Sequence, residues 1–312
     1  MVFLLSVAVV GVAQSEGDVV HVLPERNTLA RPISSPRFRA DVDLVLVNVT
    51  VLDASHRAVR GLNPADFELL ENKQPQPIKY FSSEDQPLSL VIVMDTSASM
   101  APRMDQVRHS VQKLIQTSNA QDEVSVITVG DKPGVPVSFD DPADDVERRM
   151  SVIQAGGRTA LWDAMITGLE RLQRSGYARK AMVVISDGGD NQSRYTQTEL
   201  RSRLEEADVE LYAVGIFDPF PRRVEERRGP QALDELASST GGRLLFAQNA
   251  EELKRDVEQI NDELRHQYVV GYYPSNRLRD GQWRKLKVKL HVQATRQKLH
   301  VYAKQGYRAP AG

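Results

Sequence analysis

Two different periodicities of apolar and polar residues divide the chain into distinct parts. Between residues 87 and 266, contiguous apolar runs alternate with stretches in which apolar residues recur every three or four positions. The runs predict strands that are buried on both faces, and the wider spacing predicts amphipathic helices. The predicted strands are 88–94, 124–129, 182–186, 210–216 and 243–247, and the apolar stripes of three predicted helices run from Met104 to Leu114, Leu161 to Leu172 and Leu253 to Leu264.

The segments on either side of this region follow a two-residue alternation, which is typical of half-buried strands. It runs through residues 42–53, continues in short strands up to residue 82, and returns in 267–308. The simplest arrangement pairs the β-rich segment 42–86 with the tail 267–308 in one β-sandwich. We therefore predict an α/β fold with a doubly wound, mostly parallel, Rossmann-like sheet over 87–266 and a flanking β-sandwich-like domain.

The N-terminal residues point to export. Residues 1–13 form an apolar run that is shorter than the roughly 20 residues of a membrane span, and Gly11 and Ala13 are the small residues that a signal peptidase needs. No Lys or Arg precedes the run, so an ordinary apolar strand is the alternative reading. Residues 14–41 are polar and contain three prolines, as in an extended linker. We expect a protein of the periplasm, cell envelope or extracellular space, with no transmembrane span.

The composition narrows the chemistry that the chain can carry. Its 40 basic and 42 acidic residues give a net charge of −2, which argues against a nucleic-acid partner. The absence of cysteine excludes disulfides, thiolate zinc sites and thiol nucleophiles. The six histidines lie far apart, with no pair at metal-binding helical spacing. Oxygen ligands are what remains for a metal site.

Three predicted loops bring such oxygens to one edge of the sheet. The first strand ends at Asp95 and is followed by Ser97 and Ser99 in "DTSAS". In the common strand order 3-2-1-4-5-6 the first and fourth strands are neighbours, and the fourth, counting an edge strand near "VPVSF", ends at Asp187. Thr159 follows a Gly-Gly turn, just before a predicted helix. These carboxylates and hydroxyls suit Mg²⁺ or Mn²⁺.

Each of these residues also has a purely structural interpretation. Asp95 and Asp187 are common in turns and helix caps, and the serines and Thr159 are common helix caps. Singly, each of these readings is plausible, but they do not explain why all five residues fall at one crevice. Two nearby acids, Asp163 and Asp190, are interpreted as a first-turn helix acid and a turn residue rather than as metal ligands.

The pattern resembles the von Willebrand factor A domain, whose metal-ion-dependent adhesion site (MIDAS) reads D-x-S-x-S, then a threonine, then an aspartate. The resemblance covers residues 88–265, and the flanks look like those of exported bacterial A-domain-related proteins. It implies that the hydroxyls of Ser97, Ser99 and Thr159 contact the metal, while Asp95 and Asp187 act partly through bound water. It further implies protein–protein interaction or adhesion, in which a Glu or Asp of a partner protein is the final ligand, and no enzymatic activity.

Two other functions stay open at this point. A metal-dependent hydrolase or phosphatase is the first, although a phosphatase of this type needs a second acid where the chain has Ser97, and neither a G-x-S-x-G nor a G-K-[ST] motif occurs. An envelope scaffold, in which the metal only fastens the loops, is the second. The mixed-charge stretch 222–229, "RRVEERRG", is interpreted as a solvated helix face. The resemblance also suggests a movable C-terminal helix at 250–266 that is coupled to the β tail.

Overall fold

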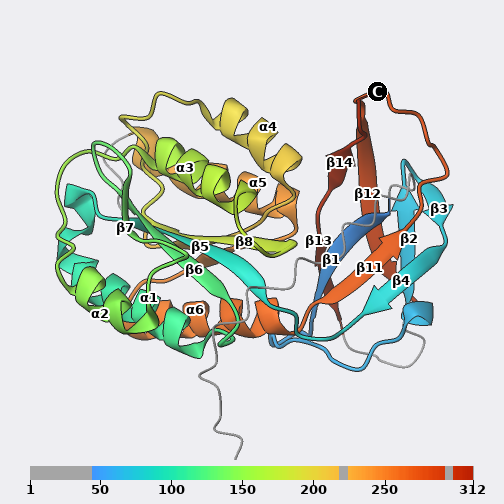
Figure 1. Ribbon diagram of the computed structural model, residues 1–312, viewed down its shortest axis with the longest axis horizontal. Coiled ribbons are helices and arrows are strands. Elements are labelled where there is room, and N and C mark those ends of the chain that lie inside the picture. Colours follow the sequence, from blue (N-terminus) through green and yellow to red (C-terminus); the bar gives the residue numbers. More distant parts are fainter. Residues whose placement is uncertain (1–43, 218–223, 292–297, 312) are drawn as a thin grey trace, which may run out of the picture. The chain divides into compact units, whose positions relative to one another are not determined.

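The computed structural model describes residues 44–217, 224–291 and 298–311 (Figure 1). The expected signal peptide, 1–13, and the extended linker, 14–41, lie outside the described residues. Within those ranges, no helix combines the length and apolar character that crossing a bilayer requires.

A six-stranded sheet forms the centre of the α/β domain. Its order is β10-β9-β8-β5-β6-β7, which is the predicted order 3-2-1-4-5-6 when the strands are counted within this domain. All neighbours are parallel except the edge strand β7, which runs antiparallel to β6. The predicted fold class is confirmed. The strands are β5 (Leu88–Asp95), β6 (Glu123–Val129), β7 (Gly134–Val137), β8 (Arg179–Ser186), β9 (Glu210–Gly215) and β10 (Leu244–Phe246).

Helices cover both faces of this sheet, which explains why its central strand is apolar on both sides. Every residue of β5 is buried: Ile92 packs among residues of one helical layer, and the next residue, Val93, packs among residues of the other. The first layer contains α1 (Met104–Thr117), α2 (Ala143–Ser151) and α6 (Ala250–Arg265). The second contains α3 (Leu161–Gln173), α4 (Gln197–Ala207) and α5 (Val224–Thr240). A 3₁₀ segment, η2 (Ala98–Arg103), precedes α1.

Two four-stranded antiparallel sheets form the β-sandwich, and each combines strands from before and after the α/β domain. Their facing sides share one apolar core, to which Val47 and Val49 of β1 and Tyr268 of β11 contribute. The first sheet has the order β13-β1-β11-β4, made of β13 (His300–Ala303), β1 (Val45–Leu52), β11 (Tyr268–Tyr272) and β4 (Ile78–Ser82). The second has the order β14-β12-β2-β3, made of β14 (Gly306–Arg308), β12 (Trp283–Leu290), β2 (Phe67–Glu71) and β3 (Gln74–Gln76).

One buried polar cluster ties the end of α6 to both domains. Gln267 lies between α6 and β11, and its Nε2 donates to both carboxylate oxygens of Glu210 at 2.7 Å and to Oγ1 of Thr50 at 3.1 Å. The guanidinium of Arg179 donates to the backbone oxygen of Leu264 and to Oε1 of Gln267. Burial raises the pKa of the Glu210 carboxyl, which the Gln267 amide and the Arg179 charge oppose.

Candidate metal centre

Asp95 is the last residue of β5, and its side chain accepts hydrogen bonds from the turn that follows it and from the end of β8. Ser97 N–H donates to Oδ1 at 2.9 Å, and Ser186 Oγ, at the end of the adjacent strand β8, donates to Oδ2 at 2.5 Å. The hydroxyl oxygens of Ser97 and Ser99 lie 3.0 Å apart. The turn after β5 therefore aims Asp95 into the protein and gathers the two serine hydroxyls beside it.

The second carboxylate of the predicted set lies close enough to influence the first. Burial, the larger cause, and the negative charge of Asp187 together raise the pKa of Asp95 to about 6, against the hydrogen bonds from Ser186 and Ser97, which lower it. Two carboxylates in a shared, poorly solvated place repel each other unless a proton or a cation intervenes. A cation at this edge of the sheet would be electrostatically favoured.

Thr159 lies in a loop that is bound to both of its neighbours. Gly156 N–H donates to the backbone oxygen of Thr96 at 2.7 Å, while Gly157, with φ of +78°, accepts from the N–H of Ala98 at 3.2 Å. On the other side, Thr159 N–H donates to Oδ1 of Asn191 at 3.1 Å, and its carbonyl oxygen accepts from the N–H of Asn191 at 3.0 Å. The three loops therefore form one connected unit.

The two nearby acids have structural partners. Oδ1 of Asp190 accepts from Leu161 N–H at 2.9 Å and from Ser193 Oγ at 2.6 Å, so Asp190 satisfies the first turn of α3 from a neighbouring loop. Oδ1 of Asp163 accepts from the backbone N–H groups of Arg194 and of the residue that follows it, at 2.9 and 3.1 Å. From the sequence, Asp190 was expected to be only a turn residue. Its side chain also caps a helix that starts 29 residues earlier.

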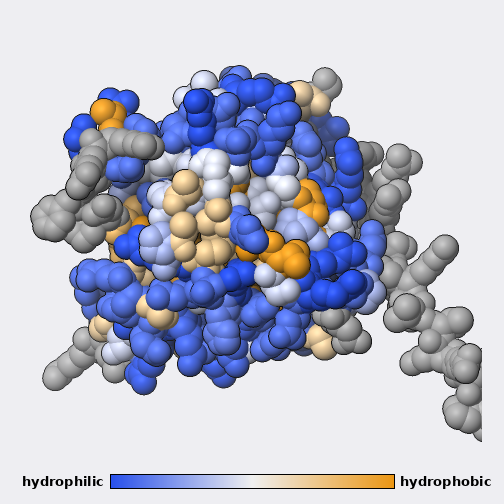
Figure 2. Space-filling model, turned by 90° about the vertical axis from the view of Figure 1, so that its left-hand side faces the viewer, coloured by the Kyte–Doolittle hydropathy of each residue, from blue (hydrophilic) through white to orange (hydrophobic). Residues whose placement is uncertain are grey.

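A cavity of about 810 Å³ opens above these loops. The strands β5 and β8 point toward the left of Figure 1, and Figure 2 faces that side, where pale and orange residues gather within a hydrophilic surround. Four of the five predicted residues line the cavity, and Asp95, fully buried, does not. The predicted lining residues are Ser97, Ser99, Thr159 and Asp187; the others include Arg158, Asn191, Glu225 and Glu226.

Sequence reasoning missed the two glutamates of this lining. They belong to "RRVEERRG", which we expected to be a solvated helix face, but α5 starts at Val224 and directs both half-buried residues toward the cavity. The close approach of Gly229 in α5 to the backbone of Gly188 brings the helix to this place. Periodicity alone carries no signal for such a tertiary contact. In the described part of the chain, no group of three His, Cys, Asp or Glu residues suits a metal ion. The lining of this cavity combines hydroxyls with carboxylates.

Comparison with curated proteins finds partial relatives. The magnesium-chelatase 67 kDa subunit of Chlorobaculum tepidum is 27% identical over 212 residues, which cover 63% of this chain and 34% of that protein. The corresponding subunit of Chlorobaculum parvum is 26% identical over 176 residues, 51% of this chain and 28% of that protein. The chain thus spans about a third of the length of the curated relatives that it matches.

Solved structures share the fold at low identity. A von Willebrand factor type A protein from Catenulispora acidiphila has a TM-score of 0.50 and 13% identity, covering 86% of this chain and 74% of that one. Proximal thread matrix protein 1 from the mussel byssus, solved with a zinc-occupied MIDAS motif, has a TM-score of 0.50 and 14% identity, covering 62% and 49%. The family model for the von Willebrand factor type A domain matches residues 89–262, more than half of the chain. The chain belongs to the von Willebrand factor type A domain family.

Proposed function

We propose that this protein binds a divalent cation, Mg²⁺ or Mn²⁺, through Asp95, Ser97, Ser99, Thr159 and Asp187, and uses it to bind an acidic side chain of a partner protein. Domains of this family often carry a MIDAS motif and bind proteins. The observation that carries the proposal is the convergence of three hydroxyls and Asp187 on one cavity, directly above the buried Asp95.

The donor set fits such an ion chemically. Hard divalent cations prefer oxygen ligands and commonly retain water, which hydroxyl-rich sites accommodate. Asp95 already accepts hydrogen bonds at both carboxylate oxygens, from Ser97 N–H and Ser186 Oγ, so it is suited to acting through bound water rather than as a main direct ligand. The mutual repulsion of Asp95 and Asp187 supplies the electrostatic attraction for a cation.

The predicted partner chemistry follows from the charge of the ligands. Three of the five residues are neutral hydroxyls, and they leave a bound divalent ion with positive charge on its exposed side. A carboxylate is the protein group that best compensates such a charge. The cavity faces outward and has room for an entering side chain. The mussel byssus protein, which shares this fold, was solved with a zinc-occupied MIDAS motif, and this supports the proposal that the chain binds a cation.

We further propose that the protein binds its partner rather than catalysing a reaction, and that it is exported. Domains of this family are typically non-catalytic. The sequence of residues 1–13 supports export to the periplasm, cell envelope or extracellular space. The magnesium-chelatase subunits match this chain over only about a third of their own length, so their name assigns it no activity.

The proposal can be tested by measuring whether a simple carboxylate strengthens the binding of the cation. Isothermal titration of the full chain with Mn²⁺ is performed in acetate and in acetamide at equal ionic strength. If a carboxylate completes the coordination, acetate strengthens Mn²⁺ binding and acetamide does not, because coupling between two ligands is reciprocal. Failure to bind Mn²⁺ would contradict the cation site, and equal binding in both solutions would contradict the carboxylate partner. A pull-down from envelope extract with and without chelator, beside Ser97→Ala, then seeks the partner.

A further inference from the structure

Arg158 is the only positively charged residue among the described residues that line the cavity at the candidate metal centre. It lies directly before Thr159, one of the proposed cation ligands, and it is exposed. The other charged residues of this lining, Asp187, Glu225 and Glu226, are all acidic. A base at this place needs an explanation, because its charge opposes the binding of a cation beside it.

The backbone around Arg158 is held from both sides. Its own N–H donates to Oδ1 of Asp131 at 2.8 Å. The residue before it, Gly157, has φ of +78°, and a Cβ at that position would lie 3.2 Å from the same Asp131 oxygen. The residue after it, Thr159, is bound to Asn191 through both its N–H and its carbonyl oxygen. These contacts fix the point from which the Arg158 side chain leaves the loop.

The guanidinium group of Arg158 is anchored without being neutralised. Its Nη1 donates to Oε1 of Gln192 at 2.8 Å, and this acceptor is an uncharged amide in the loop after β8. Within the described ranges, Arg158 has no salt-bridge partner, and its Nε and Nη2 make no hydrogen bond. Arginine has five N–H donors, so most of them stay available. Because one contact already orders the side chain, less freedom is lost when a further acceptor binds.

A purely structural role accounts for only part of this arrangement. The contact between Arg158 and Gln192 joins the loop before α3 to the loop after β8. The backbone already joins these loops, because the carbonyl oxygen of Thr159 accepts from the N–H groups of Asn191 and Gln192 at 3.0 and 3.2 Å. A neutral side chain would be enough for an additional link. The uncompensated positive charge is what a linking role leaves unexplained.

We propose that Arg158 determines specificity by binding the acidic side chain of the partner protein. A carboxylate has two oxygens. When one of them completes the coordination of the cation, the other accepts a hydrogen bond from the Nε or Nη2 group of Arg158. Hydrogen bonds between a guanidinium and a carboxylate are about twice as strong as neutral ones. This role rests on the proposed function, because the cation is the first contact of the same carboxylate.

This second contact gives the cavity a preference that the cation alone does not supply. Glu225 and Glu226 repel an entering carboxylate, whereas Arg158 attracts it, so the free oxygen of the partner's acid turns toward the loop of Arg158 and away from α5. A neutral amide also has an oxygen for the cation, but it presents no second charged oxygen to the guanidinium. We therefore expect Arg158 to favour Glu or Asp of the partner over Gln or Asn.

Titration of sodium acetate into the Mn²⁺-saturated full chain measures this contact, with the water-proton relaxation of the bound Mn²⁺ as the readout. In Arg158→Gln, acetate is expected to bind more weakly by roughly threefold or more, because a charge-assisted hydrogen bond is lost. Arg158→Lys keeps the charge without the planar fork, and it is expected to give an intermediate affinity. Mn²⁺ itself, titrated in acetamide, is expected to bind Arg158→Gln about twofold more tightly, because a nearby positive charge is removed.

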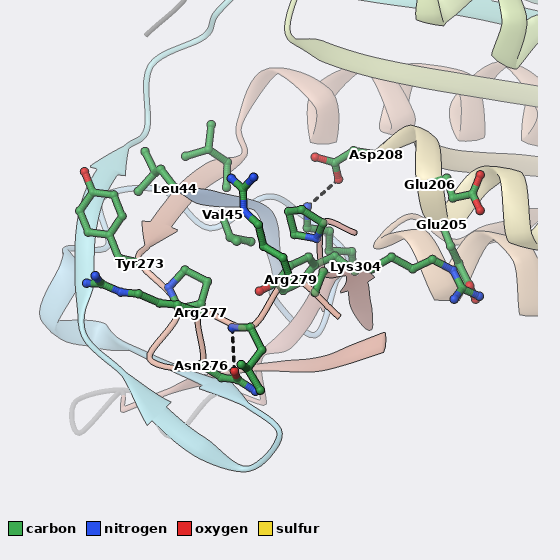
Figure 3. Close-up of a pocket in the computed structure, with 17 residues that line it drawn as sticks. Leu44, Val45, Glu205, Glu206, Asp208, Tyr273, Asn276, Arg277, Arg279 and Lys304 are labelled. Carbon is green, nitrogen blue, oxygen red and sulfur yellow. Dashed lines mark hydrogen bonds and ion pairs between the residues drawn. The ribbon is translucent and has the colours of Figure 1, made fainter. Parts of the chain in front are cut away.

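Arg277→Gln is the matched control. Arg277 is also exposed, has no salt-bridge partner in the described part of the chain, and lines a different cavity of about 490 Å³ (Figure 3). That cavity shares no lining residue with the one at the candidate metal centre. The same change of charge there is expected to leave the affinity for acetate as it is in the unmodified chain.

Equal affinity for acetate in Arg158→Gln and the unmodified chain would overturn the role of Arg158 and leave the proposed function intact. Weaker Mn²⁺ binding by Arg158→Gln in acetamide would also overturn it, since the side chain would then only hold the loops. An equal loss of acetate affinity in Arg277→Gln would do the same, because the effect would come from net charge alone. Absence of Mn²⁺ or acetate binding by the unmodified chain would contradict the proposed function, and the role of Arg158 would fall with it.

Discussion

The hydroxyl of Ser186 donates a 2.5 Å hydrogen bond to the carboxylate of Asp95, which joins the carboxyl ends of two neighbouring parallel strands. The strands β5 and β8 are in register up to Met94 and Ile185, so the next residue of each arrives at the same level of the sheet. This contact holds Asp95 beneath the cavity. The side-chain oxygens that line the cavity itself belong to Ser97, Ser99, Thr159 and Asp187.

Removing that donor should weaken both the fold and the candidate centre. In Ser186→Ala, the buried carboxylate of Asp95 loses one of two acceptor contacts, which should lower the free energy of unfolding by about 1–3 kcal/mol. The pKa of Asp95 should rise further, because this hydrogen bond lowers it. Urea unfolding at pH 7 measures the first effect. Thr198→Ala, at an exposed position of α4, is the control, and equal stability of the two variants would contradict the assigned role.

Acidification should weaken cation binding through Asp95. Its pKa is about 6 in the folded, cation-free chain against a usual value of 3.8, so its proton competes with the ion. Affinity for Mn²⁺ should fall about tenfold between pH 7 and pH 5, since protonation costs a factor of ten per pH unit below the pKa. Titration calorimetry at several pH values measures this. An affinity that stays constant over that range would show that Asp95 takes no part.

The same shift predicts how stability depends on pH without a cation. Because the folded state holds the Asp95 proton more tightly than the unfolded chain, its contribution to stability is present below about pH 4. It is lost as the pH rises through about 6. In denaturant unfolding with a chelator present, the free energy of unfolding should therefore fall between these two pH values, and Asp95→Asn should remove that fall. A fall that persists in the variant would belong to another group.

Much of this arrangement could be predicted from the sequence, because it rests on local patterns. The fully apolar run of β5 indicates a strand covered on both faces, and strand alternation indicates the order that makes β5 and β8 neighbours. The two carboxylates at these strand ends follow from that order. The position of Thr159 could be predicted from the Gly-Gly turn that precedes α3. Gly157 of that turn does adopt a positive φ.

Other parts could not be predicted, because they depend on contacts between distant segments. Ser186 looked like the last residue of a strand, and nothing local indicates that it donates to Asp95. Asp190 caps α3 across two loops, which only the tertiary structure creates. Glu225 has the charge spacing of a solvated helix, yet it lines the cavity because α5 packs against the glycine loop after β8.

That glycine loop gives a sharp test of the packing. Gly188 has φ of +75°, and a Cβ there would lie 2.8 Å from the Cα of Gly229, so Gly188→Ala meets both strain and a backbone clash. We expect it to lower the free energy of unfolding by at least about 2 kcal/mol and to weaken Mn²⁺ binding. Gly156→Ala, where a Cβ meets nothing within 4 Å, is the matched control. Thermal unfolding compares them, and equal midpoints would refute the contact between loop and helix.

The junction between the domains predicts a separate, pH-dependent effect. In Gln267→Met, Glu210 loses the amide that donates to both of its oxygens, which should cost about 1–3 kcal/mol of stability. Since the pKa of Glu210 is raised in the fold, deprotonation is unfavourable there, and the loss should be larger at pH 8 than at pH 5. Gln248→Met, at an exposed position, is the control in urea unfolding. A loss independent of pH would show that the amide does not compensate the Glu210 charge.

The most direct measurement is titration of the full chain with Mn²⁺ at pH 7.5, in parallel for the unmodified protein, S97A/T159A and Thr198→Ala. We predict one binding site, an affinity at least tenfold lower in S97A/T159A, equivalent to about 1.4 kcal/mol, and no change in Thr198→Ala. Equal affinities in all three proteins, or no binding in the unmodified chain, would contradict this prediction.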